Sequence, residues 1–251
     1  MSGHSKWSTI KRKKGAADAK RGAVFTRLTR EIVMAARDGG SDPNGNFRLR
    51  LAVDKARSEN MPKDNIERAI KRGSGEDKEG IVFEQITYEG YAPHGVAVMV
   101  ETVTDNRNRT VSDLRHALTK AGGNMGEVGS VGWQFDRVAY FSFASTAMNY
   151  DKAFELGIEV GANDVLDDNG TIEIVAPVDM FKEIADRLHA AGVQPEEAGL
   201  RMIPKQEMEL SVDQTVHVMK ALEAIEELDD VQNVFSNLKM TEEALTALEA
   251  A

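Results

Sequence analysis

The clearest folding signal in the chain is the sequence DVLDDNGTIEIV at residues 164–175. Two short apolar runs flank the turn residues Asp167–Gly170, which is the pattern of a β-hairpin. Helical patterns occupy about residues 151–160 and 179–191, and further strands are expected at 140–144 and 199–203. The order β-α-β-β-α-β predicts a ferredoxin-like α/β domain at residues 137–205.

A second α/β domain is expected on both sides of this one. Strands are predicted at 81–91 and 96–103, and a helix opens at Thr110–Asp113, which resembles a capping box, and closes at Gly122-Gly123. After residue 205 come a helix capped by Ser211–Gln214, a strand at 231–235 and a terminal helix from Thr241. A single strand and two helices have no sheet of their own to pair with unless they return to the sheet that begins at residue 81. Residues 79–136 and 206–251 are therefore predicted to form one discontinuous domain.

The N-terminal part of the chain lacks strand signals. Three short helices are expected within residues 22–78, and the polar linker Gly73–Gly80 follows the last of them. Residues 1–21 are predicted to form a basic flexible arm. The predicted fold class is therefore α+β and multidomain. A three-helix bundle is followed by two α/β domains, of which the ferredoxin-like one is inserted into the other.

Charge is divided unevenly along the chain. The whole chain has 31 Lys and Arg against 41 Asp and Glu, a net charge of −10. Residues 1–78 hold 19 cations and 10 anions, a net of +9, and residues 79–251 hold 12 and 31, a net of −19. Such a division is expected to orient the protein on a charged partner. The alternative is attraction between the two parts within one molecule.

Composition excludes several classes of protein. The chain has no cysteine, which excludes disulfide scaffolds, thiolate zinc sites and iron–sulfur clusters. No apolar run reaches the roughly 18–20 residues of a membrane span and the first residues lack the apolar core of a signal peptide, so we expect a cytoplasmic protein. The five histidines show no i, i+4 pair, and no catalytic motif is found, so neither a metal, a cofactor, a small-molecule substrate nor an enzymatic activity is expected.

The strongest functional signal is cationic. The arm carries Lys6, Trp7, Lys11, Arg12, Lys13, Lys14 and Lys20, and closely spaced cations bind a phosphate backbone while the aromatic ring can stack on a base. Arg27, Arg30 and Arg37 fall on the helix face opposite its apolar side and would extend the basic surface. The alternatives are an idle solvated tail and an ordinary solvated helix face.

Two other stretches are candidates for binding a phosphate group. Arg107 and Arg109 lie in the polar loop Asp105–Thr110 before a helix N-terminus, where a phosphate would be stabilised, although a capped, solvated loop fits equally well. The glycine-rich stretch at residues 122–133 lacks the G-x-G-x-x-G spacing and leaves a helix rather than entering one. It is therefore a poor nucleotide site.

Several motifs together resemble the YebC/PmpR family. They are MSGHSKW (1–7) with Ile10-Lys11 and Lys14-Gly15, NMPKDNI (60–66), YEGYAP (88–93), TDNRNRT (104–110) and GSVGW (129–133). The resemblance covers nearly the whole chain. It implies a helical domain and two α/β domains around a cleft, in a cytoplasmic protein usually described as a probable DNA-binding transcriptional regulator.

The resemblance also implies a second role. Relatives, including mitochondrial translational activators, are linked to translation at the ribosome, and in bacteria to relief of stalling at proline runs. We therefore expect a non-enzymatic nucleic-acid-binding regulator whose target is DNA, or alternatively ribosomal RNA on the ribosome. The sequence does not separate the two, because phosphate contacts carry no base information.

Overall fold

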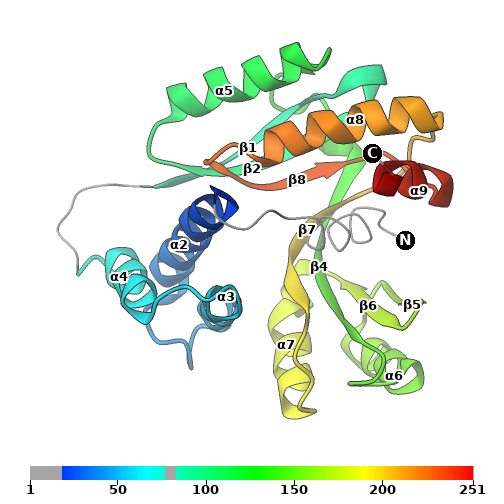
Figure 1. Ribbon diagram of the computed structural model, residues 1–251. Coiled ribbons are helices and arrows are strands. Elements are labelled where there is room, and N and C mark those ends of the chain that lie inside the picture. Colours follow the sequence, from blue (N-terminus) through cyan, green and yellow to red (C-terminus); the bar gives the residue numbers. More distant parts are fainter. Residues whose placement is uncertain (1–18, 77–82, 251) are drawn as a thin grey trace. The chain divides into compact units, whose positions relative to one another are not determined.

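The computed structural model describes residues 19–76 and 83–250. Residues 136–203 form one compact unit, and the other described residues form a second. The predicted fold class is confirmed, with three N-terminal helices followed by two sheet-containing domains, one of them ferredoxin-like (Figure 1).

The three N-terminal helices enclose their own small core. They are α2 (Ala19–Gly39), α3 (Phe47–Ser58) and α4 (Lys63–Gly73). Asn46 caps α3 by accepting from the Leu49 N–H at 3.1 Å, and its amide donates to the Ala35 carbonyl of α2 at 2.7 Å. On the same turn of α2, a Cβ on Gly73 would lie 2.4 Å from the Val33 carbonyl oxygen, so α4 approaches α2 this closely only with glycine at this point.

The sheet of the same unit has the strand order β3-β1-β2-β8. Its strands are β1 (Glu84–Tyr91), β2 (Ala97–Thr104), β3 (Asn124–Met125) and β8 (Val231–Ser236). The short helix η1 (Pro93–Gly95) turns β1 into β2. Because β8 pairs antiparallel with β2, from Val98 opposite Ser236, the C-terminal segment returns to the sheet that β1 begins.

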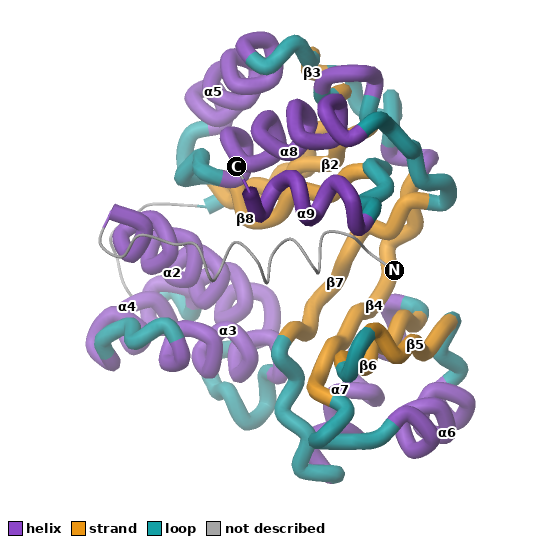
Figure 2. Tube along the Cα trace, turned by 45° about the vertical axis from the view of Figure 1, so that its right-hand side comes forward, coloured by secondary structure: helices purple, strands orange, loops and turns teal. Residues whose placement is uncertain are grey.

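Helices α5 (Arg107–Lys120) and α8 (Val212–Glu226) lie over one face of this sheet, and α9 (Glu242–Ala250) packs on α8 (Figure 2). The shared core contains Leu114 and Leu118 of α5, Leu222 of α8 and Val100 of β2. Val103 of β2 instead joins the core of the N-terminal helices, so the central strand is buried on both faces. The predicted cap of α8 is present, and Ser211 and Gln214 form a capping box there.

One predicted helix start is wrong. Asn106, not Thr110, caps α5, and its side chain accepts from the Arg109 N–H. Thr110 is buried one turn into the helix, where its hydroxyl hydrogen-bonds to Thr104 at 2.9 Å. Arg107 and Arg109 therefore belong to the first turn of α5 rather than to a loop before it.

The unit of residues 136–203 has the strand order β5-β6-β4-β7, which is the ferredoxin-like order. Its elements are β4 (Phe135–Ala144), α6 (Tyr150–Val160), β5 (Asp164–Asp168), β6 (Thr171–Ala176), η3 (Val178–Met180), α7 (Phe181–Ala190) and β7 (Glu197–Pro204). Asn169 and Gly170 both have positive φ in the β5–β6 turn, as the sequence of the hairpin indicates. Phe141 stacks on Phe181 with ring centroids 5.0 Å apart and joins sheet to helix.

The flanks of this unit lie side by side, which leads to a prediction about the domain plan. The Lys205 N–H donates to the Gln134 carbonyl at 2.8 Å, so a short linker can replace what lies between them. We expect a chain in which residues 136–203 are replaced by a short Gly/Ser linker to be soluble and to unfold in a single cooperative urea transition. A molten or insoluble product would show that the remaining sheet depends on the removed unit.

Candidate nucleic-acid interface

A buried carboxylate joins the N-terminal helices to the sheet. Asp230 precedes β8, and its side chain is 6% exposed. The carboxylate accepts from Arg30 of α2 at 2.8 Å, from Arg109 of α5 at 3.0 Å and from the Thr110 hydroxyl at 2.7 Å. The Thr104 hydroxyl at the end of β2 lies 3.1 Å from the same carboxylate and 2.9 Å from the Thr110 hydroxyl, and donates its one proton to one of these two oxygens. We call this set of five residues the Asp230 junction.

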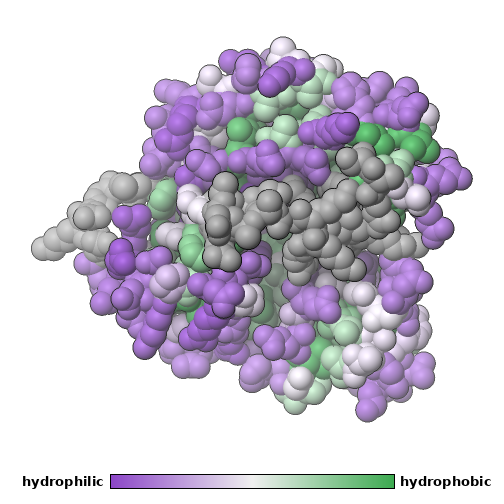
Figure 3. Space-filling view, viewed as in Figure 1, coloured by the Kyte–Doolittle hydropathy of each residue, from purple (hydrophilic) through white to green (hydrophobic). Residues whose placement is uncertain are grey.

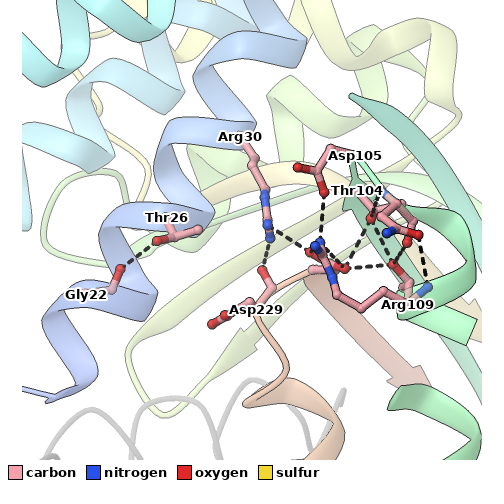
Figure 4. Close-up of polar contacts among 10 residues, drawn as sticks. Gly22, Thr26, Arg30, Thr104, Asp105, Arg109 and Asp229 are labelled. Atoms are coloured by element: carbon pink, nitrogen blue, oxygen red, sulfur yellow. Dashed lines mark hydrogen bonds and ion pairs between the residues drawn. The ribbon is translucent and has the colours of Figure 1, made fainter. Parts of the chain in front are cut away.

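The local sequence explains how these side chains meet. Thr104 ends β2 and its hydroxyl accepts from the Asn106 N–H at 2.9 Å, which fixes the turn into α5. Asn106 then caps α5, so Arg109 and Thr110 project from its first turn toward residue 230. Figure 4 shows Arg30 entering from α2 on the opposite side, where it also donates to the Asp229 carbonyl.

The charges at the junction compensate one another. Burial alone would raise the pKa of Asp230, but hydrogen bonds from Thr110 and Arg109 and the positive charges of Arg30 and Arg109 outweigh it, so the pKa of Asp230 lies below its usual 3.8. A buried carboxylate with these donors is fully hydrogen-bonded and neutralised. Loss of the carboxylate charge would leave the largely buried guanidinium of Arg30 without an anion.

Asp230→Asn is therefore expected to lower the free energy of unfolding by about 2–4 kcal/mol, because removing one member of a buried ion pair leaves the other charge desolvated. Urea titration at neutral pH measures this. The matched control is Asp105→Asn, which removes a carboxylate 2.8 Å from the same Arg109 but 37% exposed, and an exposed pair contributes about 0–1 kcal/mol. Equal effects of the two substitutions would contradict the central role of Asp230.

The stabilisation by Asp230 has a defined pH dependence. Its folded-state pKa lies below 3.8, so its contribution is complete above that value and is lost as the pH falls through the folded-state pKa. The difference in unfolding free energy between wild type and Asp230→Asn should stay level from about pH 7 to about pH 5 and shrink below about pH 4. A constant difference down to about pH 2 would exclude this titration as its cause.

The structure corrects the expectation of an open arginine stripe along α2. Arg30 is 8% exposed and belongs to the Asp230 junction. Arg27 is half-buried and donates to the Glu226 carbonyl at 2.6 Å, and burial lowers its pKa against the opposing charge of Glu226. Arg37 keeps an exposed side chain while donating to the Phe83 carbonyl at 2.6 Å. Arg27 and Arg30 thus face the sheet domain, since the acidic segment before β8 packs against this side of α2.

The basic arm lies outside the described residues. Lys6, Trp7, Lys11, Arg12, Lys13 and Lys14 all precede residue 19, and Lys20 lies in the first turn of α2 with its side chain outside the described part. Their role stays a prediction from sequence.

The two arginines of α5 differ in their surroundings. Arg109 is held between Asp105 and Asp230, and these hydrogen bonds raise its pKa. Arg107 is exposed and makes no ion pair with a described carboxylate. It lies near Tyr88. Burial raises the pKa of Tyr88, and the positive charge of Arg107 offsets part of this rise. Of the two, only Arg107 is available to an external anion.

We expect Arg109→Ala to lower the free energy of unfolding by about 1 kcal/mol, the value of a charge-assisted hydrogen bond reduced for its partial exposure. Arg107→Ala serves as its matched variant on the same helical turn, and its melting temperature should equal or slightly exceed that of the wild type, because a cation opposes the dipole at a helix N-terminus. Thermal unfolding of both variants measures the difference. Equal destabilisation by the two would contradict this division of roles.

A carboxylate of the protein itself binds the backbone N–H groups of the glycine-rich stretch. The Glu89 carboxylate of β1 accepts from the backbone N–H groups of Gly129, Val131 and Gly132 at 2.7, 2.8 and 2.7 Å. Burial raises the pKa of Glu89, but these three hydrogen bonds outweigh it and the pKa lies below the usual range. The N–H groups that a phosphate would need are already bound, which supports the rejection of a nucleotide site.

One pair of side chains was missed in the sequence. His94 of η1 and His217 of α8 face each other, with Nε2 of the first 3.2 Å from Nδ1 of the second. They lie 123 residues apart, so no local spacing could indicate the contact. No group of three or more potential metal ligands occurs among residues 19–76 and 83–250.

Comparisons with known proteins identify the family. Residues 5–76 match the model of the TACO1/YebC protein N-terminal domain, and residues 83–238 match that of the TACO1/YebC second and third domain. The chain belongs to the TACO1/YebC family. The resemblance seen in the sequence motifs is thereby confirmed.

Family members with similar sequences carry the name probable transcriptional regulatory protein. One from Geotalea uraniireducens is 54% identical over 98% of both chains, and one from Geobacter sulfurreducens is 51% identical over 99% of this chain and all of its own. The crystal structure of a conserved hypothetical protein from Aquifex aeolicus, 43% identical, superposes with a TM-score of 0.80 and covers 90% of this chain and 93% of that one. Among the described helices of this TACO1/YebC family member, none is long and apolar enough to cross a membrane.

Proposed function

We propose that this protein is a non-enzymatic regulator of gene expression in the cytoplasm that binds nucleic acid through its N-terminal segment. The observation that carries the proposal is the net charge of +9 on residues 1–78 of a chain whose total is −10. A strongly basic segment on an acidic protein selects a polyanion and turns the acidic part away from it. The names of the relatives support transcription as the process.

The described helices add accessible cations to the arm. Arg48, Lys55, Arg57 and Lys63 on α3 and α4 have side chains 48–87% exposed. Each is paired with a carboxylate within the N-terminal helices, and pairs that are largely exposed to solvent contribute little. A phosphate can therefore replace the carboxylate at small cost. Figure 3 shows hydrophilic residues over most of the visible face of the described chain.

The contacts divide into two groups. Lys6, Lys11, Arg12, Lys13, Lys14 and Lys20 bind phosphates, and Trp7 stacks on an accessible base. Arg107, exposed at the start of α5, is a second contact separate from the arm. Arg27 and Arg30 position the N-terminal helices instead, because their guanidinium groups are engaged within the protein.

Duplex DNA is the first target and ribosomal RNA the second. The second rests on Trp7, which stands among cations and suits an unpaired base better than a stacked one, and RNA loops offer such bases. Translation on the ribosome, including the relief of stalling, is the corresponding role. No membrane and no small-molecule substrate enters the proposal.

Replacing Lys11, Arg12, Lys13 and Lys14 with alanine should weaken binding to both a DNA duplex and purified ribosomes. If each cation meets one phosphate, the slope of log affinity against log salt should fall by about 3–4 for duplex DNA. Fluorescence anisotropy for DNA and co-sedimentation for ribosomes, each over a salt series, measure the change. The target whose wild-type binding survives physiological salt is the preferred one.

The matched control removes the same charge elsewhere. Lys152, Lys182, Lys220 and Lys239 are exposed cations of the acidic part, and their replacement with alanine should leave the slope unchanged. Neither set should alter the melting temperature greatly. An equal reduction of the slope by both sets would mean that only total charge matters, and would remove the arm from the proposed contact.

A further inference from the structure

Two histidines from distant parts of the chain meet on the surface of the larger unit. His94 lies in η1, the turn between β1 and β2, and His217 lies on α8. Nε2 of His94 is 3.2 Å from Nδ1 of His217, and the two rings are inclined by 75° with their centroids 5.3 Å apart. Both residues are exposed, and neither is a member of the Asp230 junction.

The turn holds His94 in an unusual backbone conformation. His94 has φ +62° and ψ 15°, in the left-handed region, and Gly95 after it has φ +80°. Glycine adopts this conformation at the least cost, and a larger residue that is held in it is more often found at functional sites. Pro93 is buried, and the Ala92 N–H donates to the Val96 carbonyl at 2.8 Å, which closes the turn. The direction of the His94 side chain is therefore fixed.

The packing of α8 fixes the second histidine. Val218 and Met219, the residues after His217, are 0% and 2% exposed in the core beneath the helix. Asp213 lies one turn before His217 and Lys220 one turn after it, and both are exposed, so the local charge is balanced. Two imidazole rings on rigid supports thus face each other before any ligand binds, which reduces the entropy lost on binding.

The separation of the two nitrogens suits a shared metal ion. Zinc binds imidazole nitrogen at about 2.0–2.1 Å, and two such bonds at a tetrahedral angle place the nitrogens about 3.3–3.4 Å apart. The distance of 3.2 Å between the rings is close to this value. A neutral imidazole has one nitrogen without a proton. Each ring can therefore present a lone pair to the ion by keeping its proton on Nδ1 of His94 or on Nε2 of His217.

We infer that His94 and His217 together bind one zinc ion, which joins η1 to α8. Imidazole is a preferred ligand of zinc, whereas Mg²⁺ and Ca²⁺ prefer oxygen. Water completes the coordination, since no group of three potential protein ligands occurs within residues 19–76 and 83–250. The site departs from the expectation that the chain binds no metal, which rested on the spacing of histidines along the sequence. It does not depend on the proposed binding of nucleic acid.

Isothermal titration calorimetry with zinc chloride tests this inference on full-length protein that has been treated with a chelator and freed of nucleic acid. His94→Gly and His217→Ala should each weaken zinc binding by about tenfold or more, since even the outer partners of metal ligands contribute that much. Glycine is chosen at residue 94 because it adopts a positive φ without strain, so the fold is preserved.

The matched controls remove other histidines one at a time. His116 of α5 and His189 of α7 are exposed on helices, and His116→Ala and His189→Ala should bind zinc as the wild type does. His4 lies outside the described residues, and His4→Ala should also retain the zinc site. Zinc binding that is unaffected by His94→Gly and His217→Ala, or that is lost in any of the three controls, would overturn the inference.

Thermal unfolding gives a second measurement. The two histidines adjoin only in the folded chain, so zinc should raise the melting temperature of the wild type as its concentration increases, and should not raise that of His94→Gly or His217→Ala. Magnesium at the same concentrations should have no such effect. A zinc effect that is lost in only one of the two variants would show that the pair is not the site. Binding to DNA or ribosomes is measured separately without zinc, so failure of either proposal leaves the other testable.

Discussion

The carboxylate of Asp230 is the constraint on which the arrangement of the larger unit depends. It is shared by an arginine from α2 and an arginine from α5, and each donor approaches from a different element. An apolar contact alone would tolerate sliding of α2 along the sheet, whereas hydrogen bonds to two oxygens at 2.8–3.0 Å tolerate little. Buried ion pairs add little net stability over apolar packing. Here the gain is one defined register between the helices and the sheet.

Much of the fold could be predicted because its signals are local. The turn at 167–170, the apolar runs beside it and the capping box at Ser211 each lie within a few residues, and the structure contains all of them. The sequence places the start of α5 at Thr110 instead of Asn106, and this error has a physical cause. Both Asn106 and Thr110 are good capping residues, and only the burial of Thr110 against Asp230, 120 residues away, distinguishes them.

The candidate site was less predictable for the same reason. Arg30 and Arg107 look alike in sequence, yet one is buried beside a carboxylate 200 residues further along the chain and the other is exposed. The attraction between basic and acidic segments within one molecule, an alternative reading of the charge division, occurs at Arg27 and Arg30. It engages only part of the basic segment, and the cations of α3 and the start of α4 stay exposed.

The three hydrogen bonds from the glycine-rich loop to the Glu89 carboxylate determine which anions this loop can bind. Successive backbone amides that converge on one anion form the kind of nest by which other proteins capture phosphate from solution. Here the anion is covalently part of the chain and cannot diffuse away. A free phosphate or nucleotide would have to displace this tethered carboxylate to reach the same three amides.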